Sequence, residues 1–205
     1  MMRRLRDIFA DESTFAIGAE LVTTRGIIMQ EDSARIVQFA DDLCQDDDVH
    51  WISVTDNAGG NVMLAPDHLG RRIVDHGKNA LIHITCKDSN RNALESAAWK
   101  YASEGLENLL VISGDYPIDG FNGMAQPVFD IDSVGLLQML RDMNQGLRIR
   151  GRKPNTYLHL DKTDFCLGCA VSPFKLTEAE QMMQYEKLKL KARSGANFVI
   201  PQLGY

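Results

Sequence analysis

Short, nearly continuous apolar runs recur along this chain, and longer stretches with helical periodicity separate them. This alternation constrains the fold more than any other feature of the sequence. The runs span residues 15–19, 51–54, 80–84, 108–112, 166–171 and 197–200. Because they lack polar alternation, they are typical of strands that are buried on both faces, as in a parallel sheet covered by helices. We therefore predict an α/β fold with six parallel strands.

The segments between the runs have the spacing of amphipathic helices. Apolar residues three or four positions apart fall within residues 36–44, 94–102 and 136–143. Asp88 or Ser89 is the predicted N-cap of the helix that contains Leu94, and Gly105 and Gly146 lie where helices should end. A last helix is predicted over residues 177–193, and its opening Thr177-Glu178-Ala179-Glu180 is close to a capping box.

The order of elements favours a barrel. Helix-sized connections between parallel strands give either an open doubly wound sheet or a closed barrel. No Gly-x-Gly-x-x-Gly follows the first run, so a Rossmann half is unsupported, and the strand interval of about 30 residues suits a TIM-type (β/α)8 barrel. We count six β/α units and predict one incomplete barrel domain over residues 1–205, which is either a fragment of a longer protein or completed in an unusual way.

One irregularity interrupts this order. Residues 147–164 are rich in Arg, Lys and Asp and are predicted to form an exposed loop insertion.

Charge and cysteine content exclude several classes of protein. The chain has 28 acidic and 22 basic residues and a formal net charge of −6, whereas a nucleic-acid footprint needs a basic stripe. No apolar run approaches the roughly 20 residues that span a bilayer, and the basic start is not followed by an apolar signal core. Four scattered cysteines do not make a disulfide framework. We expect a cytoplasmic protein without nucleic-acid or membrane partners.

Polar or glycine-rich clusters stand at the carboxyl ends of the runs. They comprise Glu20, residues 55–61, His83 with Thr85 and Cys86, residues 113–117, Ser172-Pro173 and Gln202. In a parallel barrel all these ends lie on one face, which is where barrel enzymes place their sites. Carboxylates, an amide, a hydroxyl and an imidazole beside glycines suit a small polar ligand with a planar heterocycle.

Several of these segments resemble successive motifs of one enzyme family. They are Phe15-Ala16-Ile17-Gly18-Ala19-Glu20, Ile52-Ser53-Val54-Thr55-x-x-Ala58-Gly59-Gly60, His83-Ile84-Thr85-Cys86, Val111-Ile112-Ser113-Gly114-Asp115-Tyr116-Pro117 and the stretch from Leu188 to Gln202. In order and spacing they are similar to methylenetetrahydrofolate reductase. The resemblance implies a TIM barrel holding FAD, which passes a hydride to 5,10-methylenetetrahydrofolate and makes 5-methyltetrahydrofolate. NAD(P)H or another electron donor would reduce the FAD.

The resemblance also implies roles for individual residues. Glu20 resembles the general acid at the substrate, Asp115 the aspartate beside the flavin ring, and Gln202 the glutamine that binds the pterin. The positions that resemble flavin contacts are Thr55, His83, Gly114 and Lys191. Asp132 matches an acidic position, to which we assign no role. The sequence departs from the family at Ser113, where arginine is common, and at residues 21–25, where the family often has an aromatic-proline run.

Cys166-Leu167-Gly168-Cys169 invites a different interpretation. A C-x-x-C pair can be a redox couple or half of a zinc site. Inside a strand, however, the two thiols would lie about 10 Å apart and point to opposite faces. No second cysteine pair exists, and we predict no metal site.

A second function stays open beside the reductase. It is a folate- or pterin-binding barrel without redox chemistry, acting as a carrier or as a subunit of a methyl-transfer complex. The departures from the family leave open the electron donor, an electron-donor or methyltransferase partner protein, and the oligomeric state, a homo-oligomer included.

Overall fold

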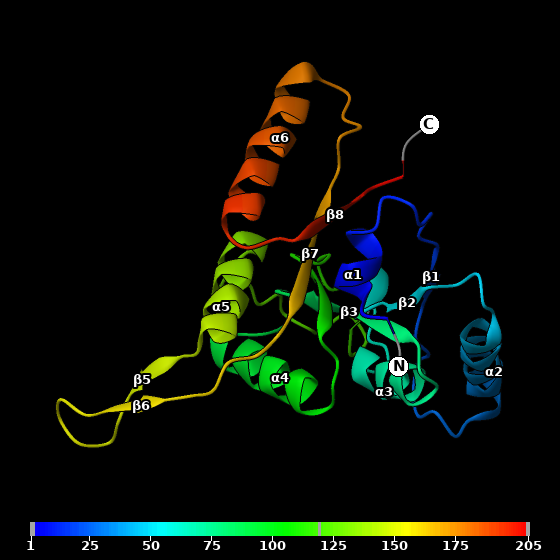
Figure 1. The fold of residues 1–205 in the computed structure, drawn as a ribbon, viewed down its shortest axis with the longest axis horizontal. Coiled ribbons are helices and arrows are strands. Elements are labelled where there is room, and N and C mark those ends of the chain that lie inside the picture. Colours follow the sequence, from blue (N-terminus) through cyan, green and yellow to red (C-terminus); the bar gives the residue numbers. More distant parts are fainter. Residues whose placement is uncertain (1–2, 119, 204–205) are drawn as a thin grey trace.

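The computed structural model describes residues 3–118 and 120–203. Within them, the main sheet holds six parallel strands in the order β1-β2-β3-β4-β7-β8. Their bounds are β1 (Gly18–Leu21), β2 (Trp51–Val54), β3 (Asn79–Thr85), β4 (Asn108–Ile112), β7 (Cys166–Val171) and β8 (Phe198–Pro201). The sheet curls into a half-barrel with helices between the strands (Figure 1). The predicted incomplete TIM-type barrel is therefore confirmed.

A helix follows each of the first five strands of this sheet. They are α2 (Glu31–Gln45), α3 (Pro66–Asp75), α4 (Arg91–Ser103), α5 (Ser133–Gln145) and α6 (Glu178–Arg193). The capping box at Thr177 and Glu180 is present, and Gly105 and Gly146 follow α4 and α5 with positive φ, as predicted. In the described part of the chain, no helix combines the length and the apolar character needed to cross a membrane.

Two local predictions were wrong. The first strand begins at Gly18, because its ladder starts where Gly18 lies opposite Trp51, the first residue of β2, so Glu20 lies inside β1 instead of after it. The N-cap of α4 is Asn90, whose Oδ1 accepts from Ala93 N at 3.1 Å. Asp88 and Ser89 instead pair with residues 128 and 129 of a later loop.

The hydrophobic core lies between the outer face of the sheet and the helices. Alternate residues of the strands, such as Ile52, Ile82 and Leu109, are fully buried there. Leu69 of α3 and Leu136 of α5 pack in the same core. Because strand side chains alternate, the other residues of each strand line the inner face of the half-barrel.

The short helix α1 (Leu5–Phe9) was not predicted, and it packs at the amino ends of the strands. The ring of Phe9 lies 5.2 Å from that of Trp51 on β2 and 4.9 Å from that of Phe198 on β8. Arg4 and Arg6 pair with Asp164, which stands just before β7. Helix α1 therefore connects both sides of the half-barrel at the end opposite to the predicted site (Figure 1).

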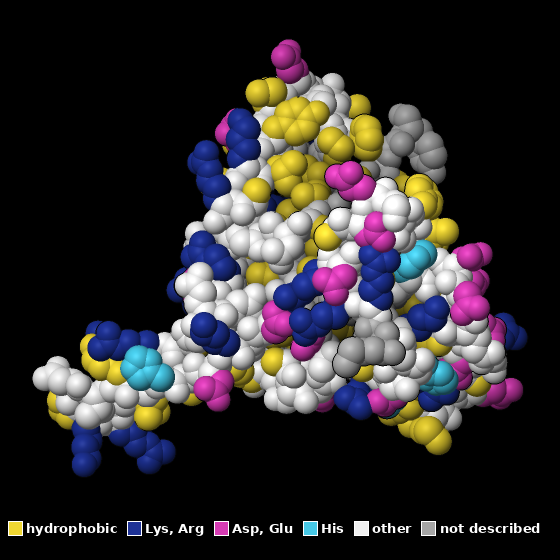
Figure 2. All heavy atoms as spheres, viewed as in Figure 1, with side chains coloured by type: hydrophobic (Ala, Val, Ile, Leu, Met, Phe, Trp, Pro, Cys, Tyr) yellow, Lys and Arg dark blue, Asp and Glu magenta, His cyan; other side chains and the backbone are white. Residues whose placement is uncertain are grey.

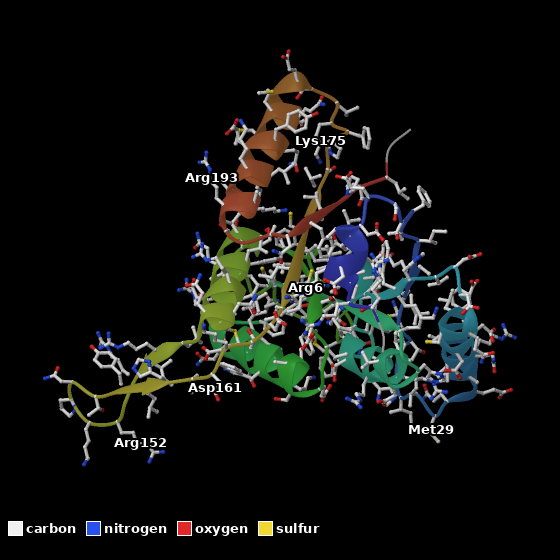
Figure 3. The ribbon with its side chains drawn as sticks, viewed as in Figure 1. Arg6, Met29, Arg152, Asp161, Lys175 and Arg193 are labelled. Carbon is white, nitrogen blue, oxygen red and sulfur yellow. The ribbon has the colours of Figure 1, made fainter. Side chains whose placement is uncertain are left out.

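The predicted insertion is exposed, but it is not all loop. Strands β5 (Arg148–Arg150) and β6 (Tyr157–His159) form an antiparallel hairpin that projects from the body (Figure 1). All six strand residues are exposed, and basic side chains including the labelled Arg152 point into solvent (Figures 2 and 3). Since neither strand has a buried face, the hydrophobic pattern that indicates a strand is missing from its sequence.

Candidate functional site

The strand register brings several predicted residues to the inner face near the carboxyl ends of the strands. Glu20 of β1 lies opposite Ser53 of β2, and Thr55 continues that row by donating its N–H to Leu21 O at 3.1 Å. His83 of β3 shares the face, because its ring is hydrogen bonded to Ser53. Parallel pairing places all these strand ends at one mouth, where the sequence predicted the site.

His83 is buried in the wall of this mouth. Its Nε2 lies 2.7 Å from Ser53 Oγ, and both side chains are buried. Burial lowers the pKa of His83 to about 4, because the charged imidazolium would lose its hydration. At neutral pH the ring is therefore neutral, with one nitrogen able to donate and the other able to accept.

Thr55 supplies an unused hydrogen-bonding group. Its side chain is buried, and its Oγ1 has no hydrogen-bond partner among the described residues. A buried hydroxyl without a partner is costly, so a polar atom of a bound molecule at this position would be stabilised. This orphaned hydroxyl fits the predicted flavin contact at Thr55.

Two glycines allow the loops above the strands to approach closely. Gly60 after β2 has φ +73, and a Cβ there would lie 2.0 Å from Tyr116 O of the loop after β4. Gly114 has φ +85, and a Cβ there would lie 2.6 Å from the side chain of Lys87. The glycine-rich sequences are thus required by loop contact at the mouth. Asp115, next to Gly114, is exposed.

The sequence analysis gave no individual role to two charged residues at the same strand ends, Asp56 within the predicted cluster of residues 55–61 and Lys87. Asp56 Oδ2 accepts from Thr85 N at 3.2 Å and from Thr85 Oγ1 at 2.7 Å, and burial raises the pKa of Asp56. Lys87 is buried, and its Nζ donates a hydrogen bond to Asn57 O at 2.6 Å. The available signal was the position of each charge two or three residues after a continuous apolar run, at the carboxyl end of a predicted strand.

The remaining predicted residues are spread around the mouth. Lys191 on α6 is buried, its Nζ donates to Ala170 O at 2.6 Å, and burial lowers its pKa. Glu20 and Gln202 are both exposed. Glu20 lies in the edge strand β1, and Gln202 directly follows the other edge strand, β8, with its N–H donated to Val171 O at 2.7 Å. The structure therefore brings Thr55 and His83 together but leaves Glu20 and Gln202 on opposite edges.

The cysteine pair lies in β7 as predicted. Cys166 and Cys169 are both buried free thiols, and burial raises the pKa of each. Cys169 packs in the core on the helix side of the sheet, whereas Cys166 lies opposite Asn108. Across residues 3–118 and 120–203, no three His, Cys, Asp or Glu side chains are grouped as metal ligands.

Comparisons with known proteins agree with this architecture. The family model described as methylenetetrahydrofolate reductase matches residues 35–205, more than four fifths of the chain. A search of curated protein sequences finds no match. A solved structure of an uncharacterized protein from Clostridium thermocellum, described as binding two copies of 5-methyl-5,6,7,8-tetrahydrofolic acid, has a TM-score of 0.60 at 10% identity. The similarity covers 93% of this chain and 55% of that one, so this chain spans about half of its length.

Proposed function

The chain belongs to the methylenetetrahydrofolate reductase family, and we propose that it reduces 5,10-methylenetetrahydrofolate to 5-methyltetrahydrofolate with bound FAD. The observation that carries the proposal is the group of Thr55, His83 and Gly114 at one mouth of the half-barrel. It offers an unpartnered hydroxyl, a neutral imidazole and a close backbone approach. These are the features by which a protein binds the polar edge of a planar ring.

The residues at the mouth fit the family's cofactor. Thr55, His83, Gly114, Asp115 and Lys191 would hold FAD, and the orphaned Thr55 hydroxyl supports this assignment. FAD would supply two-electron chemistry that no amino-acid side chain provides, and NAD(P)H or another electron donor would reduce it again after each turnover. In this proposal Asp115 disfavours negative charge near the ring, which lowers the reduction potential of the cofactor.

Glu20 and Gln202 act on the substrate in this proposal. Gln202 binds the pterin through its amide. Glu20 donates a proton to a folate nitrogen, so that the five-membered ring opens and the methylene carbon can accept a hydride. Because Glu20 is exposed on the edge strand β1, substrate can reach its carboxyl group from the open side of the half-barrel.

Replacing Glu20 by Gln tests the proposal, because it keeps the shape of the side chain and removes its proton. General acid catalysis typically contributes about 10²–10⁴-fold. We expect the Glu20→Gln protein to bind FAD and to be reduced by its donor at the wild-type rate. Its reoxidation by methylenetetrahydrofolate should slow by roughly 10²–10⁴-fold, as measured by stopped-flow absorbance of each half-reaction.

The exposed Glu12 on the segment before β1 offers a control, since Glu12→Gln removes a carboxylate without touching the mouth. Both half-reactions of the control should match the wild type. If the two half-reactions of Glu20→Gln slow equally, Glu20 maintains the site instead of donating a proton. If neither slows, the acid is another residue.

A folate carrier without redox chemistry is the second candidate. It is favoured by the fold similarity to a protein described as binding 5-methyltetrahydrofolic acid. Absorbance separates the two functions: protein that takes up FAD and shows an oxidised-flavin spectrum supports the reductase. Colourless protein that takes up no FAD but binds methyltetrahydrofolate in calorimetry supports the carrier.

A further inference from the structure

Lys87 is a buried lysine at the mouth that the proposed function has not used. Its N–H donates to Ser113 O at 3.0 Å, so the residue continues the pairing of β3 with β4. It lies two and four positions beyond Thr85 and His83, on the inner face by strand alternation. Its side chain packs under Gly114 and is only 1% exposed.

The ammonium group of Lys87 has fewer partners than it has protons. Nζ donates to Asn57 O at 2.6 Å, and Asp88 Oδ2 lies at 3.8 Å, beyond hydrogen-bond distance. An ammonium has three donors, so among the described residues two remain without a hydrogen-bond acceptor. A buried charge in this condition is costly unless an acceptor, above all an anionic one, completes its surroundings.

The site around this ammonium is built from two loops. Asn57 has a left-handed backbone conformation (φ 46), which turns its carbonyl to Nζ, and its Oδ1 accepts from Met63 N at 2.8 Å. On the other side, only a glycine fits at position 114, because a Cβ would overlap the Lys87 chain. Lys87 is therefore held in place from both sides. By strand alternation it lies on the same face as His83, and the unpartnered hydroxyl of Thr55 belongs to the inner face of the neighbouring strand end.

We propose that Lys87 is the positive charge that compensates the negative charge of the reduced flavin, and so raises the reduction potential of the bound cofactor. Two-electron reduction with uptake of one proton leaves a flavin ring with one negative charge. One buried ammonium matches that charge, and it opposes the effect assigned to Asp115. This inference rests on the proposed function, because it requires that FAD binds at this mouth.

The diphosphate of FAD is a less suitable counter-ion for Lys87. A diphosphate carries about two charges and is usually bound by several exposed donors or a helix N-terminus. Lys87 contributes one buried ammonium here, with the carboxylate of Asp88 at 3.8 Å and the buried carboxylate of Asp56 also within its electrostatic influence. The other buried lysine at the mouth, Lys191, donates to Ala170 O instead. An ammonium group can pair with either anion, the diphosphate or the reduced flavin ring. The diphosphate is charged before and after reduction, whereas the ring becomes negatively charged only on reduction.

Replacing Lys87 by Gln tests the inference, because the amide can still donate to Asn57 O but carries no charge. We expect oxidised FAD to bind with an affinity within about threefold of the wild type. Reduced FAD should bind about tenfold more weakly relative to oxidised FAD, which lowers the two-electron potential by about 30 mV. The measurements are a redox titration of the bound flavin and calorimetry with oxidised FAD and with riboflavin.

Lys78→Gln is the matched control, because Lys78 Nζ also donates to backbone carbonyls, those of Asp46 and Val49, but before β3 at the opposite end of the strand. Its potential should equal that of the wild type. Circular dichroism checks the fold of each variant, and Lys87→Met provides a second neutral side chain if the amide is not tolerated.

The outcomes separate the two proposals. Wild-type protein that takes up no FAD overturns both the proposed function and the role of Lys87. An unchanged potential in Lys87→Gln overturns the role of Lys87 alone. Weaker binding of oxidised FAD with unchanged potential and unchanged riboflavin binding also overturns it, and assigns Lys87 to the diphosphate.

Discussion

Two basic side chains on the inner side of β3 are accommodated in different ways. His83 is uncharged at neutral pH because its ring is buried with Ser53 as its hydrogen-bond partner. Lys87 lies where the backbone carbonyl of Asn57 can accept from it. Both solutions depend on a neighbouring strand or loop, and both place a polar group on the inner side of the half-barrel near the carboxyl ends of the strands.

The low pKa of His83 predicts a pH-dependent stability. In the unfolded chain the histidine takes up a proton near pH 6.5, whereas the folded protein does so only near pH 4. Between these values the unfolded state binds more protons, so the free energy of unfolding should fall as the pH is lowered, by up to about 3 kcal/mol in total.

Urea denaturation of wild type and His83→Asn at pH 7 and pH 4 measures this contribution. The other titrating groups are common to both proteins, so the difference between their pH dependences belongs to His83. We expect the variant to lose less stability on acidification. Equal losses in the two proteins would contradict the assignment.

At the scale of elements, the hairpin of β5 and β6 differs from every other part of the fold. Its strand residues are all exposed, and a two-stranded ribbon without a buried face contributes little to stability. The contact that organises it is local, since the guanidinium of Arg148 lies 3.7 Å from the ring centre of Tyr157. The hairpin is thus an appendage, whereas α2 to α6 bury the core.

Replacing residues 149–158 by a short Gly-Ser turn should leave the protein folded. No buried side chain is removed, and the change in the free energy of unfolding should stay within about 0.5 kcal/mol. Chemical denaturation checks the value. Leu140→Ala in α5, which is fully buried, is the comparison and should cost about 2–5 kcal/mol. A hairpin deletion that costs as much would mean that the hairpin packs on the body.

At the scale of the whole molecule, the half-barrel exposes more surface than a closed globule. Its accessible area is 12551 Å², whereas a folded monomer of 22.9 kDa is expected to expose about 9600 Å². Part of the excess is apolar: Phe174, Leu176 and Val199 lie near the β8 side with exposed side chains, and Figure 2 shows hydrophobic surface along α6. With both edges of the sheet open, contacts that connect distant strands become important.

Helix α1 provides such a contact through Phe9. Its ring touches Trp51 and Phe198, which come from strands on opposite sides of the half-barrel. Phe9 is half-buried, so Phe9→Ala should lower the free energy of unfolding by about 2 kcal/mol. Phe15→Ala is the control, because Phe15 is 87% exposed and its loss should be nearly neutral. Thermal or urea unfolding of both variants measures the two changes in the free energy of unfolding. Equal changes would contradict a stabilising contact of α1 between the two sides of the sheet.

Local patterns in the sequence were sufficient for the element order and for part of the site. Continuous apolar runs identified five of the strands almost to the residue, and helical spacing located α2, α4, α5 and α6. The capping box at Thr177 and the glycines after α4 and α5 were also evident, because caps and turns depend on neighbours within a few residues. The family motifs added Thr55, His83 and Gly114, which the fold brings to one mouth.

The tertiary structure decided what depends on residues distant in the chain. The start of β1 is set by pairing with Trp51, the N-cap of α4 by the engagement of Asp88 and Ser89 elsewhere, and the position of Lys87 by Asn57 and Gly114. Sequence patterns with periods of 2 and 3.6 report which face of an element is buried, but not which partner meets it. The polar groups at this mouth are positioned by contacts between strands and loops that are distant in the chain, and these contacts form only when the chain folds.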